Sequence, residues 1–391
     1  MKLHLFFLIL ICCSCSGQSS DLGNWKTEKA NNQRTNYVNT NLPTKVPEVV
    51  WKKKISLASS PVVADGIVYF GDDENHFYAF DIANNKEIWK IKTASIVSSA
   101  VIDDNDIIYL AGIKNIIAID RKTGEQLWNK EDNSLKAVLK IQDNILYLVD
   151  YYQTPEGFAH LTAFDTKTGN KLWSFSDLSN LDVPVINDGV LYIPKPSQSK
   201  FYALDSKTGN ELWSIESKYR INPIISNGKI FLSSQSSVYA ISEKNGTELW
   251  NYKLLHQDCS VVGVTDKIVF LASRNSVTQI IEIHALDLHT GEVKWKKTYE
   301  SATIFTFAVA NNNTLIFGIN TLKEYLSGSA VLYALNSKNG TEIWQKKFNN
   351  IWINPEIIAL NNAIIFKATQ MNGLGNTNSD EYEGEYLYLL K

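Results

Sequence analysis

The chain has 391 residues, of which 44% are hydrophobic and 20% charged, and its formal net charge at pH 7 is −3. This charge and the lack of a basic run argue against a nucleic-acid partner. Three of the four cysteines lie within the first fifteen residues, so Cys259 stands alone in the remainder, where no internal disulfide can form. We expect Cys259 to behave as a small buried hydrophobic residue.

The first fourteen residues have the pattern of a secretory signal peptide. Lys2 precedes an unbroken apolar stretch from Leu5 to Cys13, which is too short to span a membrane. The small residue before Cys15 and the Ser-Gly-Gln-Ser-Ser after it resemble a bacterial lipoprotein signal, in which the cysteine is diacylated and becomes the first mature residue. Cys13 is a second candidate for lipidation, and a secretory signal without lipid is the alternative.

The segment after Cys15, residues 16–48, is rich in Ser, Asn and Thr. Such a composition is typical of a linker. We therefore predict a signal peptide over 1–14, a lipidated cysteine with a flexible tether over 15–48, and one folded domain over 49–391.

The folded part repeats one eleven-residue phrase seven times, Ala-x-Asp-x-x-x-Gly-x-x-x-Trp with minor drift. The copies begin at Ala79, Ala118, Ala163, Ala203, Ala240, Ala285 and Ala334. Their tryptophans follow one another at intervals of 37 to 49 residues, which is the period expected of β-propeller blades.

Each copy of the phrase predicts a β-hairpin. Its central glycine accepts a positive φ in a tight turn without steric cost, and Asn85 replaces it in the first copy. These turn glycines are Gly124, Gly169, Gly209, Gly246, Gly291 and Gly340. The repeated aspartate can accept hydrogen bonds from turn amides, so we interpret it as structural rather than catalytic.

The tryptophan that ends each copy is expected to cover the seam between one blade and the next. A half repeat at the start of the domain adds one more, so the set is Trp51, Trp89, Trp128, Trp173, Trp213, Trp250, Trp295 and Trp344. Loss of one such ring should cost about 3–5 kcal/mol. The alternative, exposed tryptophans that bind sugars or peptides, does not suit so regular a position.

Two further strands precede each phrase, and in three copies they are joined by Asp-Gly or Asn-Gly, as in Pro61 to Phe70, Pro184 to Ile193 and Pro223 to Leu232. One blade is therefore four antiparallel strands. The ends of the domain each carry part of a blade, because Val49 to Trp51 is an outer strand and Ile353 to Lys391 supplies three strands. Pairing the two removes free sheet edges and predicts an all-β, eight-bladed β-propeller.

The sequence contains no group of residues with the spacing of a catalytic or metal site. The six histidines lack metal-ligand spacing, and there is no nucleophile elbow, phosphate-binding glycine loop or Cys-His pair. We expect no catalytic residue, no metal and no cofactor.

The connections between second and third strands vary in length, and the long ones are Asp150 to His160, Ser273 to Glu282, Asn320 to Ser329 and Thr369 to Glu383. Insertions on one face of a rigid scaffold commonly carry binding function, although drift of exposed loops is the alternative. Tyr151, Tyr152 and Tyr325 are the candidate partner-binding residues there, or else ordinary rim residues.

The repeats resemble those of the PQQ-type β-propellers, and Asn24-Trp25, Asn32 and Arg34 resemble the lead-in of that superfamily. One branch, the quinoprotein dehydrogenases, uses pyrroloquinoline quinone and calcium and typically stacks the cofactor against a vicinal disulfide. The other branch is typified by BamB, an outer-membrane lipoprotein of the β-barrel assembly machinery. The length, the eight blades, the lipid signal and the lack of adjacent cysteines in the mature chain favour the second branch.

The resemblance implies a non-catalytic scaffold, lipid-anchored in the bacterial outer membrane and facing the periplasm, or else exposed at the cell surface. Its partner would be a protein such as a β-barrel assembly protein, and the scaffold would be a monomer outside that complex. Two alternatives stay open: a small PQQ-dependent quinoprotein oxidoreductase, and a periplasmic sensor or carbohydrate-binding propeller.

Overall fold

The computed structural model describes residues 24–27, 29–56, 59–113, 115–131, 136–151, 158–179, 183–195, 198–216, 223–234, 236–254, 259–275, 277–300, 304–310, 312–322, 328–371 and 382–391. Within these ranges, no helix has the length and apolar character needed to cross a membrane.

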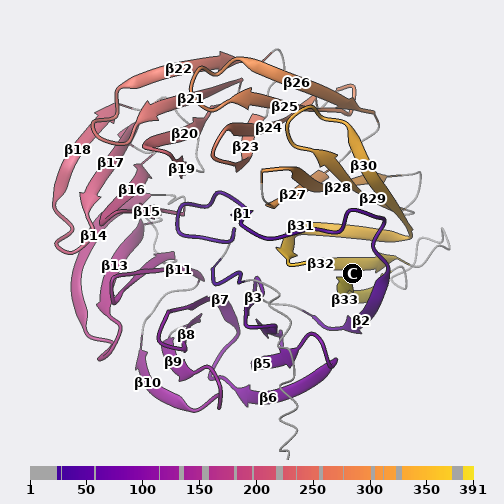
Figure 1. Ribbon diagram of the computed structural model, residues 1–391. Helices are drawn as coiled ribbons and strands as arrows, with labels where there is room; N and C mark the ends of the chain where they lie inside the picture. The colour runs from indigo at the N-terminus through magenta and orange to yellow at the C-terminus, as the bar shows by residue number, and fades with distance from the viewer. Residues whose placement is uncertain are drawn as a thin grey trace, which may run out of the picture.

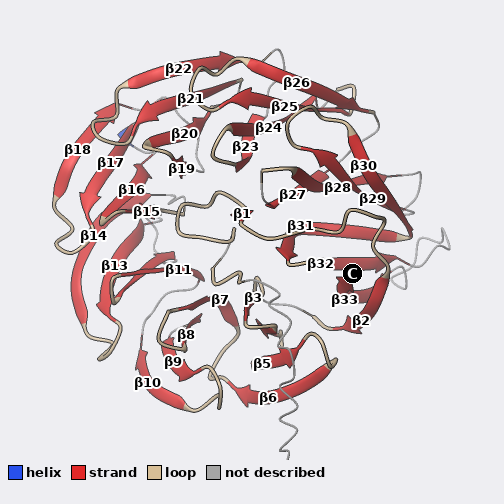
Figure 2. Cartoon of the chain, in the orientation of Figure 1, coloured by secondary structure: helices blue, strands red, loops and turns tan. Residues whose placement is uncertain are grey.

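The described elements are strands, arranged as eight sheets around a common axis (Figures 1 and 2). Blade 1 contains β3 (Val62–Ala64), β4 (Ile67–Gly71), β5 (His76–Asp81) and β6 (Lys86–Lys92). Blade 2 contains β7 (Val97–Ile102), β8 (Ile107–Gly112), β9 (Asn115–Asp120) and β10 (Gln126–Glu131). Blade 3 contains β11 (Lys136–Gln142), β12 (Ile145–Tyr151), β13 (Phe158–Asp165) and β14 (Lys171–Ser179). Blade 4 contains β15 (Val185–Asn187), β16 (Val190–Lys195), β17 (Lys200–Asp205) and β18 (Glu211–Glu216).

The second half of the ring has the same organisation. Blade 5 contains β19 (Ile224–Ser226), β20 (Lys229–Ser233), β21 (Ser237–Ser242) and β22 (Glu248–Lys253). Blade 6 contains β23 (Cys259–Val264), β24 (Ile268–Asn275), β25 (Ile280–Asp287) and β26 (Val293–Tyr299). Blade 7 contains β27 (Ile304–Ala310), β28 (Thr314–Leu322), β29 (Gly328–Asn336) and β30 (Glu342–Asn349), and β1 (Tyr37–Val38) pairs in parallel with β27. Blade 8 contains β31 (Ile351–Leu360), β32 (Ala363–Met371), β33 (Tyr382–Leu390) and β2 (Val49–Lys54).

The two ends of the chain close the ring in blade 8. The strand β2 pairs antiparallel with β33, so that Trp51 lies opposite Leu389. Backbone bonds between Glu48 and Lys391, at 2.7 and 3.0 Å, extend this pairing by one residue. The predicted eight-bladed propeller and its mode of closure are confirmed.

The hairpins give the ring two different faces. In each blade the turn between first and second strands lies on the same side as the turn between third and fourth strands, which we call the turn face. The loops between second and third strands and the crossovers between blades lie on the opposite side, the loop face. The first such turn, Asp65-Gly66, has φ values of 50° and 77°, as a type I′ hairpin requires.

The repeated phrase locks each blade to the next by a tryptophan hydrogen bond. The indole Nε1 groups of Trp51, Trp89, Trp128, Trp173, Trp250 and Trp295 donate to the carbonyl oxygens of Ile82, Arg121, Thr166, Ser206, Leu288 and Ser337, at 2.9 to 3.2 Å. Each acceptor directly follows the turn position of the repeated aspartate in the following blade. Because β33 has no such turn after it, Trp344 donates instead to Pro43, at 2.7 Å.

The turn glycine has a second role beyond its positive φ. It lies against the face of the preceding blade's indole, and a Cβ on Gly209 would come within 2.7 Å of the Trp173 ring. The aspartate of the same turn acts as expected, since Asp205 Oδ1 accepts hydrogen bonds from the amides of Lys207 and Thr208 at 3.1 and 2.8 Å.

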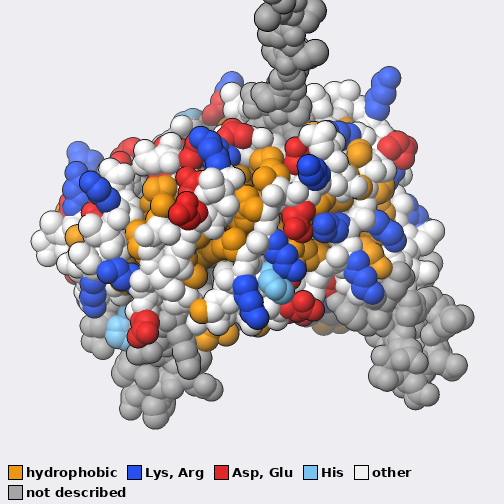
Figure 3. Space-filling view, turned by 90° about the horizontal axis from the view of Figure 1, so that it is seen from below, with side chains coloured by type: hydrophobic (Ala, Val, Ile, Leu, Met, Phe, Trp, Pro, Cys, Tyr) orange, Lys and Arg blue, Asp and Glu red, His pale blue; other side chains and the backbone are white. Residues whose placement is uncertain are grey.

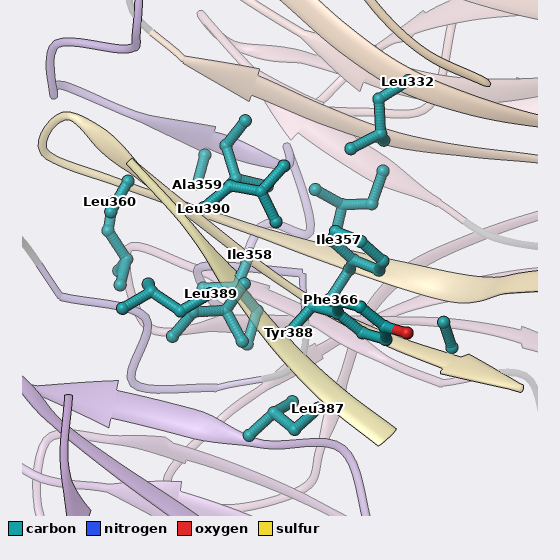
Figure 4. Close-up of a cluster of buried hydrophobic side chains, with 14 of the residues drawn as sticks. Leu332, Ile357, Ile358, Ala359, Leu360, Phe366, Leu387, Tyr388, Leu389 and Leu390 are labelled. Atoms are coloured by element: carbon teal, nitrogen blue, oxygen red, sulfur yellow. The ribbon is translucent and has the colours of Figure 1, made fainter. Parts of the chain in front are cut away.

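The hydrophobic core is divided among the seams between blades. One buried cluster joins Val62 and Tyr69 of blade 1 to Val97 and Ile108 of blade 2. The largest cluster surrounds blade 8, where side chains from β31, β32 and β33 pack between blades 7 and 1 (Figure 4). Phe366 and Tyr388 stack there with ring centroids 5.1 Å apart. Cys259 is buried, as expected, and its thiol donates to the Ser234 carbonyl at 3.1 Å.

The segment expected to be a flexible tether differs in its described part, 24–27 and 29–48. It is hydrogen-bonded to the ring from Trp25 to Glu48. In Figure 1 it runs across the middle of the disc and then reaches β2 at the rim. Many of its polar groups form hydrogen bonds to distant strands, as Asn32 does to Ile141 and Asn36 to Val262.

The long connections on the loop face differ from the expected loops as well. Much of their length extends the strands, since β24, β28 and β32 have eight or nine residues, whereas β4 and β20 have five. In blade 6 the two strands meet in a tight turn, in which the Gln279 amide donates to the Asn275 carbonyl at 2.9 Å. In blades 6, 7 and 8 the described part of the insertions therefore lengthens paired strands on the loop face.

Candidate functional site

The axis of the ring is a natural site for a ligand. At the turn face this axis is occupied by the chain's own N-terminal segment. Trp25 exchanges two backbone hydrogen bonds with Val63 of blade 1, at 2.7 and 2.8 Å. The Lys26 carbonyl accepts from Ile102 of blade 2 at 2.9 Å. We call residues 24–27 and 29–47 the axial segment.

The axial segment then contacts the remaining blades in chain order. It forms hydrogen bonds or strand pairs with one or two residues of each. These are Ile141 of blade 3, Ile186 of blade 4, Ile225 of blade 5, Val264 of blade 6, Val309 and Ala310 of blade 7, and Asn362 of blade 8. These partners lie at the turn-face ends of the inner strands or in the turn that follows. A single short segment therefore forms hydrogen bonds to all eight blades.

Buried polar groups fill this part of the axis. Arg34 is 3% exposed and donates to the Val183 carbonyl at 3.3 Å, and Lys140 is fully buried and donates to Thr27 Oγ1 at 3.3 Å. Four residues of the axial segment have φ between 54° and 75°, a region that residues other than glycine rarely adopt. They are Lys29, Ala30, Arg34 and Asn36. Such strain persists only where surrounding contacts determine the backbone.

A cavity of about 350 Å³ opens where blade 8 meets blade 1, and we call it the closure pocket. Pro355 cannot donate to the strand ladder, and the register of β31 shifts between Ile353 and Ile357. This bulge brings Asn354 and Glu356 to the pocket wall.

The buried Asn320 of blade 7 supports the bulge. Its amide donates to the Ile353 carbonyl at 2.7 Å and accepts from the Ile353 amide at 2.9 Å. Beside the bulge, Lys367 lines the closure pocket and forms an ion pair with Glu385 at 2.7 Å.

The residues that line the closure pocket do not fit a calcium–quinone centre. Calcium takes roughly six to eight oxygen ligands. The closure pocket offers one carboxylate, Glu356, and one amide, Asn354, and its lysine already pairs with Glu385. Cys259 is the one described cysteine, so this part of the chain has no vicinal pair against which a quinone could stack.

Asp72, Glu74 and His76, which the sequence did not single out, form a group of potential metal ligands whose ligand atoms lie within 4.8 Å of one another. They stand on the hairpin between β4 and β5, away from the axis. The Asp72 carboxylate already accepts from the amides of Glu74 and His76 and from the Tyr78 hydroxyl, at 2.7 to 2.9 Å. The close spacing of these residues is therefore explained by a turn that the carboxylate holds together.

Comparison with known proteins decides the family. The family model described as outer membrane protein assembly factor BamB matches residues 47–154 and 157–318, which together exceed half of the chain. The chain belongs to this family. No curated protein sequence gives a significant match to this member of the BamB family.

Solved structures share the fold of this BamB-family ring. BamB from Moraxella catarrhalis has a TM-score of 0.60 at 12% identity, over 88% of this chain and all of that chain (100%). Quinohemoprotein alcohol dehydrogenase from Comamonas testosteroni has a TM-score of 0.66 at 12% identity, over 96% of this chain and 81% of that chain. A europium-containing methanol dehydrogenase has a TM-score of 0.64 at 13% identity, over 95% and 98%. At these identities the likeness concerns the fold alone.

The outer wall of the BamB-family ring presents one aliphatic side chain in most blades, next to the seam tryptophan. These side chains, 38 to 53% exposed, are Val50, Ile88, Leu127, Leu172, Leu212, Leu249 and Ile343. Figure 3 shows the wall from the side of blades 1 and 2, with hydrophobic patches interleaved with charged groups. In blade 6 the corresponding residue is Lys294, which pairs with Asp287 at 2.9 Å.

Some of the predicted site residues lie together in the structure, and others fall outside the described residues. The seam tryptophans and turn glycines come together in pairs from adjacent blades, as described above. Of the candidate partner-binding residues, Tyr151 is the last residue of β12, opposite Ala159, whereas Tyr152 and Tyr325 lie outside the described residues. The lipidation candidates Cys15 and Cys13 also lie outside them. The axial segment lies outside the repeats and bonds mostly to backbone groups, so the repeat pattern does not predict its contacts.

Proposed function

We propose that this protein is a non-catalytic binding scaffold of the cell envelope that assists the assembly of outer-membrane β-barrel proteins. The observation that carries the proposal is the axial segment. Residues of the chain itself lie on the axis at the turn face and bond to all eight blades, and the closure pocket offers one carboxylate and one side-chain amide, fewer than a calcium–quinone centre needs.

In this proposal the ring and the lengthened hairpins have different roles. The closed ring supplies a rigid disc whose sheet edges are short. The lengthened hairpins of blades 6, 7 and 8 are neighbours on the loop face, where they would hold a protein partner. In family terms, that partner is a β-barrel assembly protein of the outer membrane.

A lipid on Cys15 would hold this scaffold close to the membrane. Asn24 lies nine positions after Cys15, and its side chain accepts a hydrogen bond from the Asp65 amide at 3.1 Å. Nine residues reach at most about 30 Å when fully extended. The axial segment thereby limits the distance that the ring can move from its anchor.

The test is affinity purification of the tagged, full-length protein from gently solubilised membranes, followed by mass spectrometry, with Cys15→Ala as the control. We expect near-stoichiometric recovery of an outer-membrane β-barrel assembly protein, and release of the Cys15→Ala form from the membrane fraction. A folded, membrane-bound protein that recovers no such partner would overturn the scaffold proposal. Quinone-dependent dye reduction by the purified protein would overturn its non-catalytic part.

A further inference from the structure

One seam of the ring has an open pocket where the corresponding part of another seam is filled. A cavity of about 500 Å³ lies between blades 4 and 5 on the turn-face side. Its wall includes Asp188, Tyr192, Trp213, Gly228 and Glu243. We call this cavity the 4/5 pocket.

The repeats allow a position-by-position comparison with the seam between blades 1 and 2. Glu243 and Arg121 each follow the turn position of the repeated aspartate. The backbone bonds coincide, because Glu243 N donates to Gly228 O at 3.0 Å and Arg121 N donates to Asp106 O at 2.9 Å. Gly228 therefore corresponds to Asp106.

The other two positions correspond as well. Asp65 and Asp188 both open the first hairpin turn of their blade, with φ values of 50° and 44°. Tyr69 and Tyr192 both follow that turn on the second strand, each two residues after its first residue. The two seams thus share a tyrosine and an aspartate at matching places.

The seam between blades 1 and 2 is filled by an arginine of the chain itself. The Arg121 guanidinium forms an ion pair with Asp65 at 2.7 Å and donates through Nε to Asp106 at 2.9 Å. Its Nη1 donates to the Tyr69 hydroxyl at 3.5 Å. The arginine side chain is only 8% exposed. This seam shows which group such a tyrosine–aspartate frame holds.

The 4/5 pocket has a carboxylate where the arginine would be. Glu243 Oε1 accepts hydrogen bonds from Asn187 Nδ2 at 2.7 Å and from the Tyr192 hydroxyl at 3.2 Å, which fix its orientation. Burial and the nearby Glu243 carboxylate raise the pKa of Tyr192, so its hydroxyl stays a donor. A Cβ on Gly228 would meet no atom within 4 Å.

Other copies of the repeat underline how unusual this position is. The residues equivalent to Glu243 are all buried, namely Ile82, Arg121, Thr166, Ser206, Leu288 and Ser337. Glu243 is partly exposed. The carbonyl of Glu243 accepts from Tyr192 at 3.3 Å, and among the described tryptophans of the motif Trp213 is the one whose Nε1 makes no such bond.

We propose that the 4/5 pocket binds the guanidinium of an arginine side chain presented by a partner protein. Asp188 and Glu243 supply two carboxylates against the single ammonium of Lys244, a balance that favours a cation. The planar guanidinium matches carboxylates and stacks on indole, which a lysine ammonium does less well. Leu212, 53% exposed beside Trp213, offers apolar contact for the arginine stem.

This inference deepens the proposed function and rests on it for the identity of the partner, because it names the chemistry by which a partner is held. The first experiment uses the full chain and a defined probe, acetyl-Gly-Arg-Gly-amide, titrated by calorimetry at low salt. The matched peptide carries citrulline, which keeps the shape and lacks the charge. We expect the citrulline peptide to bind at least about tenfold more weakly. Equal affinity of the two peptides, or no binding of the arginine peptide at millimolar concentration, would overturn the proposal.

Variants then locate the binding. Glu243→Arg puts an arginine beside Asp188 and Tyr192, as Arg121 lies beside Asp65 and Tyr69, so the new side chain should occupy the pocket, abolish peptide binding and raise the thermal midpoint. Glu243→Gln keeps the size of the side chain and should weaken binding about tenfold. Glu248→Gln makes the same charge change on the same blade outside the pocket and should leave affinity unchanged. Wild-type affinity in both Glu243 variants would place the peptide elsewhere and refute the assignment.

The peptide titration and the membrane purification can fail independently. If the arginine peptide binds and no barrel-assembly protein is recovered, the pocket assignment stands and the proposed function falls. If a barrel-assembly protein is recovered and Glu243→Arg recovers it equally well, while the peptide does not bind, the pocket assignment falls alone.

Discussion

A pair of glycine-to-alanine substitutions separates two costs that the turn glycines avoid. Gly209 and Gly189 have nearly equal φ values, 74° and 77°. At Gly209 a Cβ would lie 2.7 Å from Cε3 and 2.8 Å from Cδ2 of Trp173, whereas at Gly189 the nearest atom is Ser206 Oγ at 3.8 Å. The indole cannot move away freely, because its Nε1 is bonded to the Ser206 carbonyl at 3.2 Å.

The two variants should therefore differ in stability by the indole contact alone. Alanine in the left-handed region costs about 1–2 kcal/mol, and this is the whole expected cost of Gly189→Ala. Overpacking against a fixed ring adds about 1–3 kcal/mol, so Gly209→Ala should cost about 2–5 kcal/mol in total. Urea unfolding followed by circular dichroism measures both free energies of unfolding. The dependence of the free energy on urea concentration should be the same in both variants, so that the two values can be compared. Equal destabilisation by the two substitutions would refute the argument that the indole requires glycine.

Three further substitutions test the axial segment, the closure pocket and the turn carboxylates. Trp25→Ala removes a side chain that is 1% exposed and should cost about 3–5 kcal/mol in thermal or urea unfolding, whereas a free tether predicts no change. Asn320→Ala leaves the buried amide and carbonyl of Ile353 without the bonds they now make, and should cost about 2–4 kcal/mol in the same assay, with no loss expected if water replaces the amide fully. The hydrogen bond from Lys294 lowers the pKa of Asp287 to about 2, so the stabilisation is present above about pH 4 and is lost as the pH falls towards 2. Asp287→Asn should remove this part of the acid-induced loss of stability, and an unchanged pH dependence would contradict the assignment.

The repeat determined most of the fold before any contact was known. A tryptophan, a turn glycine and a turn carboxylate recur at fixed places, and local turn chemistry converts each recurrence into a hairpin. The half repeats at the two ends then require closure of the ring, which β2 and β33 provide. What the repeat could not show is that Gly209 also makes room for an indole of the neighbouring blade, since that contact joins residues of different repeats.

The sequence by itself therefore determined the strands, the blade number and the mode of closure, because these follow from local propensities repeated many times. The tertiary structure alone decided the course of residues 24–27 and 29–48. Their composition is that of a linker, and the repeat does not predict their contacts because their partners lie far away in the chain, as Pro43 and Trp344 are 301 positions apart. The tertiary structure also decided the character of each seam. Arg121 and Glu243 occupy the same position of the repeat. The residues across each seam decide their role, because Arg121 forms ion pairs that fill its seam, whereas Glu243 lines an open pocket.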